Sequence, residues 1–322
     1  FMNAGYGNFS ISSHLISVKV IDIQTLNIFN ISREELTFRY RYSSFQKNKL
    51  IIVDFNNVFD KEEYIYDLIS QNLESNWKLR RLPKVLLAIL KVAISEDMQI
   101  CADEGIQIFG GMGFSAEAPI ESAWRDARIG RIYEGTNEIN RMLIIGMLLK
   151  KAMKGSLDIM TPYQDVLNNK PLSIEEKCEA FDDEIILVEN IKKIFLLLLG
   201  KAFEKYGPEI EKNQQVLLSL SDLAIEAYLS ESTLKRTIKN INRSSIEDQF
   251  DQINMTKLYI YEACQIVLKR SSDVINSIID LKNQDEIYSS IRSKLKYSEN
   301  PNIFELKTKI AEKIISENKY CF

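Results

Sequence analysis

Histidine is almost absent from this chain of 322 residues, in which His14 is the only one. A Ser–His–Asp triad or a metal site built from several histidines is therefore almost excluded, and acid–base chemistry must come from Glu, Asp, Tyr, Lys or a bound cofactor. The four cysteines form no C-x-x-C pair, which favours reduced thiols in a cytoplasmic protein, and we expect no metal ion. They are Cys101, Cys178, Cys264 and Cys321.

Long apolar runs and an excess of basic residues are also missing. No run approaches the ~20 apolar residues that a membrane-spanning helix needs. The leucine run at 196–199 is better explained by packing between helices, which leaves association with a membrane surface open. Lys and Arg number 41 against 45 Asp and Glu, a balance that argues against nucleic acid as the main partner. Because Phe1 precedes Met2 and no signal peptide follows, we expect the chain to begin inside a longer protein.

The hydrophobic pattern changes near residue 60. Before that point, alternating residues predict a strand over 15–23, a partner strand over 26–31 and a buried strand over 50–53. A capping box at 32–35 predicts the start of a short helix.

After residue 60 the apolar residues recur with the period of helices. Two segments interrupt this pattern: the glycine-rich stretch 105–114 is expected to be a loop, and 155–171, which holds two prolines, a linker. Capping boxes are expected at 173–176 and 244–247. The predicted helices cover 62–73, 83–101, 136–152, 185–206, 209–239, 246–280, 286–296 and 304–317.

Residues 103–141 hold the densest grouping of side chains suited to binding a ligand. Three glycines between positions 110 and 113 let the backbone approach a ligand closely. Glu134 is followed by Gly135, which leaves room beside the carboxylate, and Thr136 is suited to cap a helix whose N-terminus offers N–H groups to phosphate. By their chemistry alone, these features indicate no more than a turn and the start of a helix.

The order of the motifs is more specific. The chain reads Gln-Ile-Phe-Gly-Gly-Met-Gly-Phe from Gln107, Arg-Asp-Ala-Arg-Ile from Arg125, and Ile-Tyr-Glu-Gly-Thr from Ile132. These three motifs, in this order and separation, resemble the acyl-CoA dehydrogenase family from about residue 83 to the C-terminus. The long helical extension after Gly155 is similar to that of very-long-chain-type members and suggests a bacterial protein. The resemblance implies a mainly α fold, the family's C-terminal helical bundle with an α-helical extension, preceded by a small α+β fragment.

The resemblance also implies roles for individual residues. Glu134 matches the base that removes the α-proton of an acyl-CoA thioester in a dry, apolar pocket, while FAD accepts the β-hydride, in fatty acid β-oxidation. The backbone N–H of Glu134 matches a donor to the thioester carbonyl, and Gly135 matches a position that contacts substrate. Implied partners are acyl-CoA, an electron-transfer flavoprotein as acceptor, and further copies of the chain in a dimer or tetramer. Positions matching FAD contacts are Thr136, Asn137 and Glu138, and, for the FAD of a neighbouring subunit, Gln107, Ile108, Phe109, Gly110 and Gly111.

The first residues carry different motifs, Asn3-Ala4-Gly5-Tyr6-Gly7 and Tyr40-Arg41-Tyr42-Ser43-Ser44-Phe45. These resemble UDP-N-acetylenolpyruvoylglucosamine reductase, another flavoenzyme, over residues 1–57 only. Arg41 matches a catalytic arginine of that enzyme and is expected to be the remnant of a site. The predicted organisation is an α+β fragment over 1–57, a junction over 58–82, a partial C-terminal helical domain over 83–155 and a helical extension over 156–322.

Three functions follow from these resemblances. The first is FAD-dependent dehydrogenation of acyl-CoA to trans-2-enoyl-CoA, with this chain carrying the half that holds the base. The second is a non-catalytic, truncated or chimeric helical bundle, because the β-barrel that sandwiches the flavin ring in the family has no counterpart here. The third is a fragment of the UDP-N-acetylmuramate dehydrogenase, which is disfavoured because the rest of its nucleotide-binding domain is missing. Flavin absorbance of the purified protein discriminates between the first two.

Overall fold

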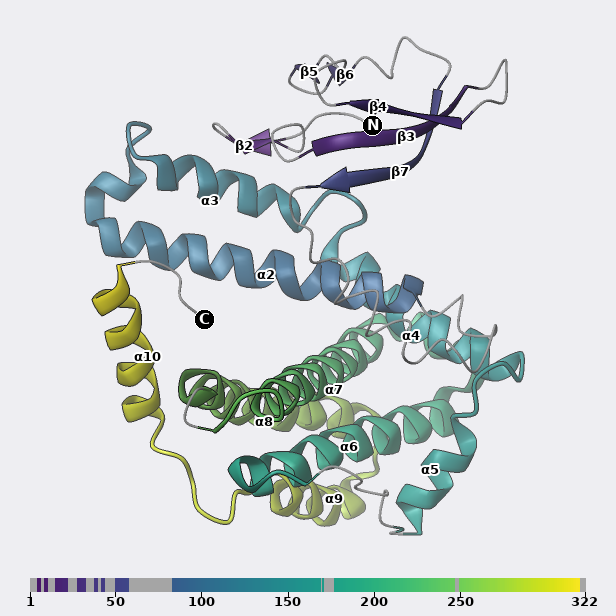
Figure 1. Cartoon of the computed structure of the whole chain (residues 1–322). Coiled ribbons are helices and arrows are strands. Elements are labelled where there is room, and N and C mark those ends of the chain that lie inside the picture. The colour runs from purple at the N-terminus through teal and green to yellow at the C-terminus, as the bar shows by residue number, and fades with distance from the viewer. Residues whose placement is uncertain are drawn as a thin grey trace. The chain divides into compact units, whose positions relative to one another are not determined.

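The computed structural model describes residues 5–6, 9–10, 15–22, 28–32, 38–39, 42–43, 50–57, 83–168, 170, 177–246 and 249–318, which Figure 1 colours along the chain. The chain divides into two compact units. Residues 1–81 and 98–130 form one unit, and residues 82–97 and 131–322 form the other.

Several predicted features fall outside the described residues. They are the helix over 62–73, the capping box at 173–176, Glu247 of the box at 244–247, and Arg41. Of the first capping box only Ser32 is described, and it is the last residue of a strand. The predicted division of the chain into four segments stays a prediction.

The N-terminal part of the chain contains an antiparallel sheet of three strands in the order β4–β3–β7. Backbone pairs such as Val18 with Ile31 set the register, and the β3–β7 ladder contains two register shifts. The three strands overlap the segments predicted at 15–23, 26–31 and 50–53. The strands are β1 (Gly5–Tyr6), β2 (Phe9–Ser10), β3 (Leu15–Asp22), β4 (Ile28–Ser32), β5 (Phe38–Arg39), β6 (Tyr42–Ser43) and β7 (Leu50–Asn57), with β1 paired to β2 and β5 to β6.

Helices make up the described chain from Pro83 onward, and local signals set several of their ends. Pro83 occupies the first helical position, where its missing N–H costs no hydrogen bond. The Thr136 side chain caps α4 by accepting from the backbone N–H of Ile139 at 3.3 Å. The elements are α2 (Pro83–Phe109), the 3₁₀ helix η5 (Gly110–Phe114), α3 (Pro119–Gly130), α4 (Asn137–Met153), α5 (Met160–Leu167), η6 (Glu179–Phe181), α6 (Asp182–Tyr206), η7 (Gly207–Lys212), α7 (Gln214–Ile241), α8 (Phe250–Ile278), α9 (Leu281–Lys294) and α10 (Ile303–Glu317).

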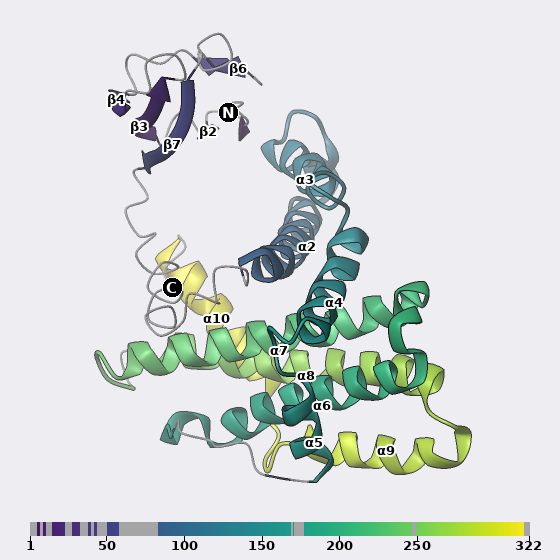
Figure 2. The same ribbon diagram turned by 90° about the vertical axis from the view of Figure 1, so that its right-hand side faces the viewer.

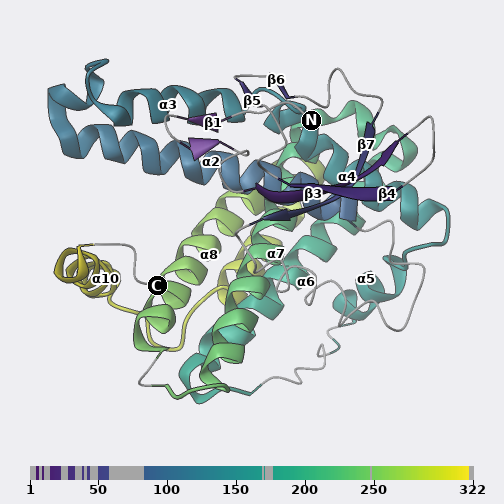
Figure 3. The ribbon, with the colours of Figure 1, turned by 45° about the horizontal axis from the view of Figure 1, so that its top comes forward.

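The long helices α6, α7 and α8 run beside one another (Figures 1 and 3), and α9 lies along α6 and α8 (Figure 2). Their facing sides form one hydrophobic core with α4 and the start of α2. Ile144, Leu198, Leu220 and Val274 are each 0% exposed, and each such side chain contributes roughly 1.5–3 kcal/mol by leaving water. One core therefore contains residues on both sides of position 155.

The leucine run at 196–199 belongs to this core. Leu198 and Leu199 are 0% and 1% exposed, so packing between helices accounts for them. Among the residues that the structure describes, no helix combines the length and the apolar character needed to cross a membrane.

The prediction of a loop over 105–114 was wrong. Helix α2 continues to Phe109, and η5 follows it directly. Gly105 lies inside the helix, and the close approach of α3 favours a residue without a side chain there: a Cβ at Gly105 would lie 2.8 Å from Cδ1 of Ile120. The turn comes at Gly110, whose φ of +61° suits a residue without a side chain.

The prediction of a linker over 155–171 was wrong in its middle, where α5 forms. Tyr163 of α5 is 0% exposed, and its hydroxyl donates to Oε1 of Glu204 on α6 at 2.7 Å. Gly200 of α6 permits this contact, since a Cβ there would lie 2.4 Å from the Tyr163 ring. Pro162 is the third residue of α5, a position where a missing N–H removes no helical hydrogen bond.

Candidate active site

Residues 131–136 form the connector before α4, and it carries Glu134. The backbone N–H of Asn137 closes this connector by donating to the carbonyl oxygen of Arg131 at 3.1 Å. Glu134 and Gly135 both have positive φ, at 54° and 80°. The left-handed region costs a residue with a side chain roughly 1–2 kcal/mol, so surrounding contacts must hold Glu134 in this conformation.

Packing as well as the backbone conformation favours glycine at position 135. A Cβ at this position would lie 3.1 Å from Nδ2 of Asn140. The space that the missing side chain leaves is therefore occupied on this side by the Asn140 amide.

Two polar side chains hold the carbonyl groups of the connector. The Asn140 amide, which is buried, donates to the carbonyl oxygens of Gly135 at 2.8 Å and Thr136 at 3.1 Å, with that of Glu134 further away at 3.5 Å. Nζ of Lys91 on α2 donates to the same Gly135 carbonyl at 2.8 Å. The main chain around Glu134 is thus fixed from two elements, while the Glu134 side chain itself is exposed.

Asn137 is 1% exposed, and its side chain is engaged inside the chain. Its amide nitrogen donates to Oγ of Ser95 and to Oε1 of Glu96, each at 3.0 Å. Its Oδ1 accepts from Nζ of Lys91 at 2.6 Å. Of the three residues predicted to touch a cofactor at the start of α4, Thr136 and Glu138 therefore keep accessible side-chain surface.

Arg141 on α4 joins three helices through buried ion pairs. Its guanidinium binds both carboxylate oxygens of Glu96 on α2 at 2.8 Å, and its Nε lies 2.6 Å from Oδ1 of Asp222 on α7. Arg270 on α8 binds the other Asp222 oxygen at 2.7 Å. Burial alone would raise the pKa of the Glu96 carboxyl, but hydrogen bonds from Arg141 and its charge hold that pKa below its ordinary value.

The network behind the connector was missed by the sequence analysis. Lys91, Ser95 and Glu96 are spaced at i, i+4 and i+5, so they form a polar stripe on one face of a helix whose residues 85–90 are all apolar. That stripe was a readable signal. Asn140 and Arg141 gave none, because their importance depends on contacts between elements that are distant in sequence.

The other predicted site residues lie in the other compact unit. Gln107, Ile108 and Phe109 form the last turn of α2, and Gly110 and Gly111 begin η5. Ile108 and Phe109 are 84% and 60% exposed, which is unusual for such apolar side chains and marks a surface suited to contact another molecule. Nearby, Trp124 is half-buried and donates to Asp103 at 2.9 Å, and Arg125 forms an ion pair with Glu121 one turn earlier on α3.

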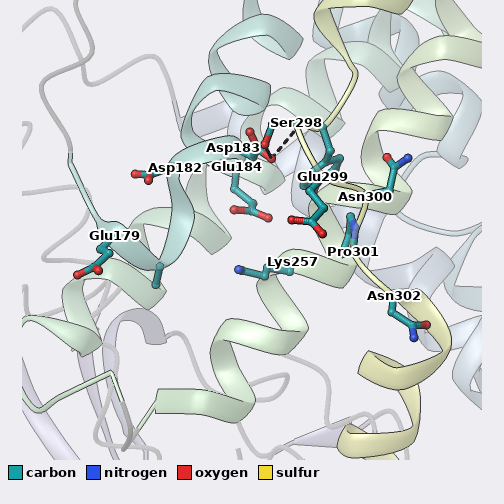
Figure 4. A pocket seen from close by; sticks show the side chains of 12 residues that line it. Glu179, Asp182, Asp183, Glu184, Lys257, Ser298, Glu299, Asn300, Pro301 and Asn302 are labelled. Atoms are coloured by element: carbon teal, nitrogen blue, oxygen red, sulfur yellow. Dashed lines mark hydrogen bonds between the residues drawn. The ribbon is translucent and has the colours of Figure 1, made fainter.

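A pocket of about 510 Å³ lies elsewhere, between the start of α6 and the segment before α10 (Figure 4). Its charged lining residues are Lys257 and five acids: Glu179, Asp182, Asp183, Glu184 and Glu299. Ser298 closes one side by donating from its N–H and its hydroxyl to Asp183, at 3.0 and 2.7 Å. This excess of carboxylates repels phosphate groups, so the lining of the pocket does not suit a phosphate-bearing ligand.

Comparison with known proteins matches the segment around the Glu134 connector to a protein family. Two models, both described as the C-terminal domain of acyl-CoA dehydrogenase, match residues 67–149 and 190–293. The first match begins inside the predicted junction over 58–82 and includes Lys91, Glu134 and Arg141. The second covers much of α6–α9.

Individual relatives agree with these models. A probable acyl-CoA dehydrogenase of Bacillus subtilis is 33% identical over 235 residues, 71% of this chain and 39% of the relative. A crystal structure of an acyl-CoA dehydrogenase complexed with FAD from Bacillus anthracis has a TM-score of 0.70 at 32% identity, covering 74% of this chain and 41% of that one. The chain thus spans about two fifths of the length of these relatives.

A separate match bears on the second resemblance. UDP-N-acetylenolpyruvoylglucosamine reductase of Prochlorococcus marinus is 40% identical over 68 residues, 21% of this chain and 23% of that enzyme. Both resemblances drawn from the motifs are thus confirmed. The two domain models and the fold of the helical region agree on the larger one, and this chain therefore belongs to the acyl-CoA dehydrogenase family, whose C-terminal domain it carries.

Proposed function

We propose that this chain supplies the catalytic base for FAD-dependent α,β-dehydrogenation of acyl-CoA to trans-2-enoyl-CoA, a step of fatty acid β-oxidation. The observation that supports the proposal most directly is the Glu134 connector. An exposed carboxylate stands on a main chain that is held in the left-handed region by hydrogen bonds from α2 and α4. Strain of this kind is concentrated at functional sites, and the connector lies in a family-matched segment.

In the proposed reaction the Glu134 carboxylate takes the proton from the α-carbon of the thioester, and a hydride leaves the β-carbon, so that the carbon–carbon double bond forms. When bound, FAD supplies the acceptor for that hydride. The backbone N–H of Glu134 is proposed to donate to the thioester carbonyl, which makes the α-proton more acidic. A carboxylate is more basic when the substrate and the rest of the site exclude water from it.

The residues present fit part of an FAD site. A Cβ at Gly110 or Gly111 would meet nothing within 4 Å, so the backbone there is open to a ligand. Thr136 and Glu138 would hold FAD at the start of α4, whereas Gln107, Ile108 and Phe109, beside these glycines, would contact the FAD of a neighbouring subunit. The dehydrogenase is proposed to act in the cytoplasm as a dimer or tetramer that passes electrons to an electron-transfer flavoprotein.

The test is exchange of the α-proton, which depends on the base and requires no electron acceptor. The purified chain is incubated with FAD and an acyl-CoA in heavy water, and deuterium incorporation at the α-carbon is followed by mass spectrometry. We expect Glu134→Gln to slow this exchange by about 10²–10⁴-fold, the usual contribution of a positioned general base.

Glu312→Gln is the matched control, because Glu312 is an exposed glutamate on α10 and should exchange at the wild-type rate. Exchange that persists in Glu134→Gln would refute the assignment of the base. Absence of both flavin absorbance and exchange in the wild-type chain would favour the non-catalytic helical bundle instead.

A further inference from the structure

Helix α2 places one lysine against the connector that carries Glu134. Nζ of Lys91 donates to the carbonyl oxygen of Gly135 at 2.8 Å and to Oδ1 of Asn137 at 2.6 Å. The two acceptors lie on either side of Thr136, the cap of α4. Lys91 therefore spans the point where the connector becomes a helix, from a helix that is more than 40 residues away in sequence.

The ammonium group of Lys91 is partly buried among carboxylates. Burial lowers the pKa of Lys91, and the negative charges of Glu138, Glu96 and Glu134 act in the opposite direction. A charged donor in such surroundings makes stronger hydrogen bonds than a neutral one. The ammonium group of Lys91 thus binds two acceptors, the Gly135 carbonyl and the Asn137 side chain, on one short segment.

The connector needs this support because its conformation is unfavourable by itself. Glu134 has a φ of 54°, and Gly135, with a φ of 80°, is free to adopt many other conformations once its contacts are lost. Asn140 holds the connector from inside α4, and Lys91 binds a connector carbonyl from α2. Ser95 and Glu96 of α2 bind this segment only through the Asn137 side chain, at the start of α4.

We propose that Lys91 is a positioning residue that fixes the Glu134–Gly135 turn against α2, so that the Glu134 carboxylate and backbone N–H keep one placement. This role rests on the proposed function of Glu134 as the base. Lys91 acts through the Gly135 carbonyl and the Asn137 side chain and does not touch the reacting atoms.

Hydrogen exchange of the full chain, resolved by mass spectrometry, tests the proposal without any assay of activity. The peptide covering 131–140 contains the N–H groups of Asn137, Ile139 and Asn140, which are hydrogen-bonded within the connector and its cap. We expect Lys91→Met to speed their exchange about tenfold, as expected for losing a hydrogen bond from a charged donor. Lys91→Arg, which keeps the charge and the donors, should restore most of the protection.

Lys84→Met is the matched control, because Lys84 is an exposed lysine in the first turn of the same helix. It should leave exchange in 131–140 unchanged, and none of the variants should alter exchange in α7. Unchanged exchange in Lys91→Met would overturn the proposal, as would faster exchange in α7, which would mean a general loss of stability. Equal exchange in Lys91→Arg and Lys91→Met would also overturn it. Because the readout is local protection, the outcome is independent of whether Glu134→Gln affects α-proton exchange.

Discussion

Replacing Arg141 by methionine tests how strongly the ion pairs between α2, α4 and α7 stabilise the fold. Methionine keeps much of the unbranched side chain but removes the charge and the donors. Three close contacts are lost, two to Glu96 at 2.8 Å and one to Asp222 at 2.6 Å. Both carboxylates are largely buried, with 28% and 11% of their side-chain surfaces exposed.

The expected cost lies near the lower end of the usual range. Removing one member of a buried ion pair costs about 3–5 kcal/mol, because the other charge is left without compensation. Here the remaining carboxylates keep other partners: Glu96 still accepts from Asn137 at 3.0 Å, and Asp222 still pairs with Arg270 at 2.7 Å. We therefore expect Arg141→Met to lower the free energy of unfolding by about 3 kcal/mol.

Urea unfolding followed by far-ultraviolet circular dichroism measures this loss as a lower midpoint at an unchanged slope. The double variant Arg141→Met with Glu96→Gln shows how much of the loss comes from leaving the Glu96 charge unpaired. If the cost arises from an unpaired Glu96 charge, the double variant should recover about 1–2 kcal/mol of it. A loss below about 1 kcal/mol in Arg141→Met, the level of an exposed pair, would refute the reasoning.

Two further predictions concern packing and pH. Gly200→Ala should lower the free energy of unfolding by about 1–2 kcal/mol, because its Cβ would lie 2.4 Å from the buried Tyr163 ring. Gly146→Ala is the control and should not destabilise the protein, because its Cβ would meet nothing within 4 Å. Equal urea midpoints for the two variants would contradict the importance of the contact with Tyr163. Burial raises the pKa of the Glu226 carboxyl from 4.5 to about 7, although a hydrogen bond from Tyr259 acts to lower it. The folded protein therefore loses stability as the pH rises from about 4.5, the pKa of this carboxyl in the unfolded chain, through about 7. Glu226→Gln should remove this pH dependence and raise the free energy of unfolding by up to about 3 kcal/mol over the wild type near pH 8. Parallel pH profiles of the urea midpoint for the two proteins would show that Glu226 does not titrate in this way.

Local signals in the sequence were enough to predict most helices. The helix predicted over 136–152 forms as Asn137–Met153, because Thr136 is a cap that acts on its own nearest N–H groups. The same holds for Ile303–Glu317, where Asn302 accepts from the N–H of Glu305. Helix ends of this kind depend on residues within one turn of the cap, so they can be predicted from the sequence.

The errors came where packing overrides local preference. Gly105 was interpreted as part of a loop, but α2 runs through it to Phe109, and the close approach of Ile120 on α3 favours a glycine at that position. The motif identified Glu134 as a candidate base, yet Lys91 could not be connected with it from the sequence. Their association depends on a contact between Lys91 and Gly135, which are separated by 44 residues.

The left-handed backbone at Glu134 also bears on how this protein would respond to engineering. Glycine or asparagine adopts a φ near 54° with less strain than glutamate does. A library of variants screened only for resistance to heat should therefore replace glutamate at position 134 by glycine or asparagine. With Glu134 as the base proposed above, glutamate would be retained at position 134 only under selection for turnover, because selection for stability alone favours a different residue there.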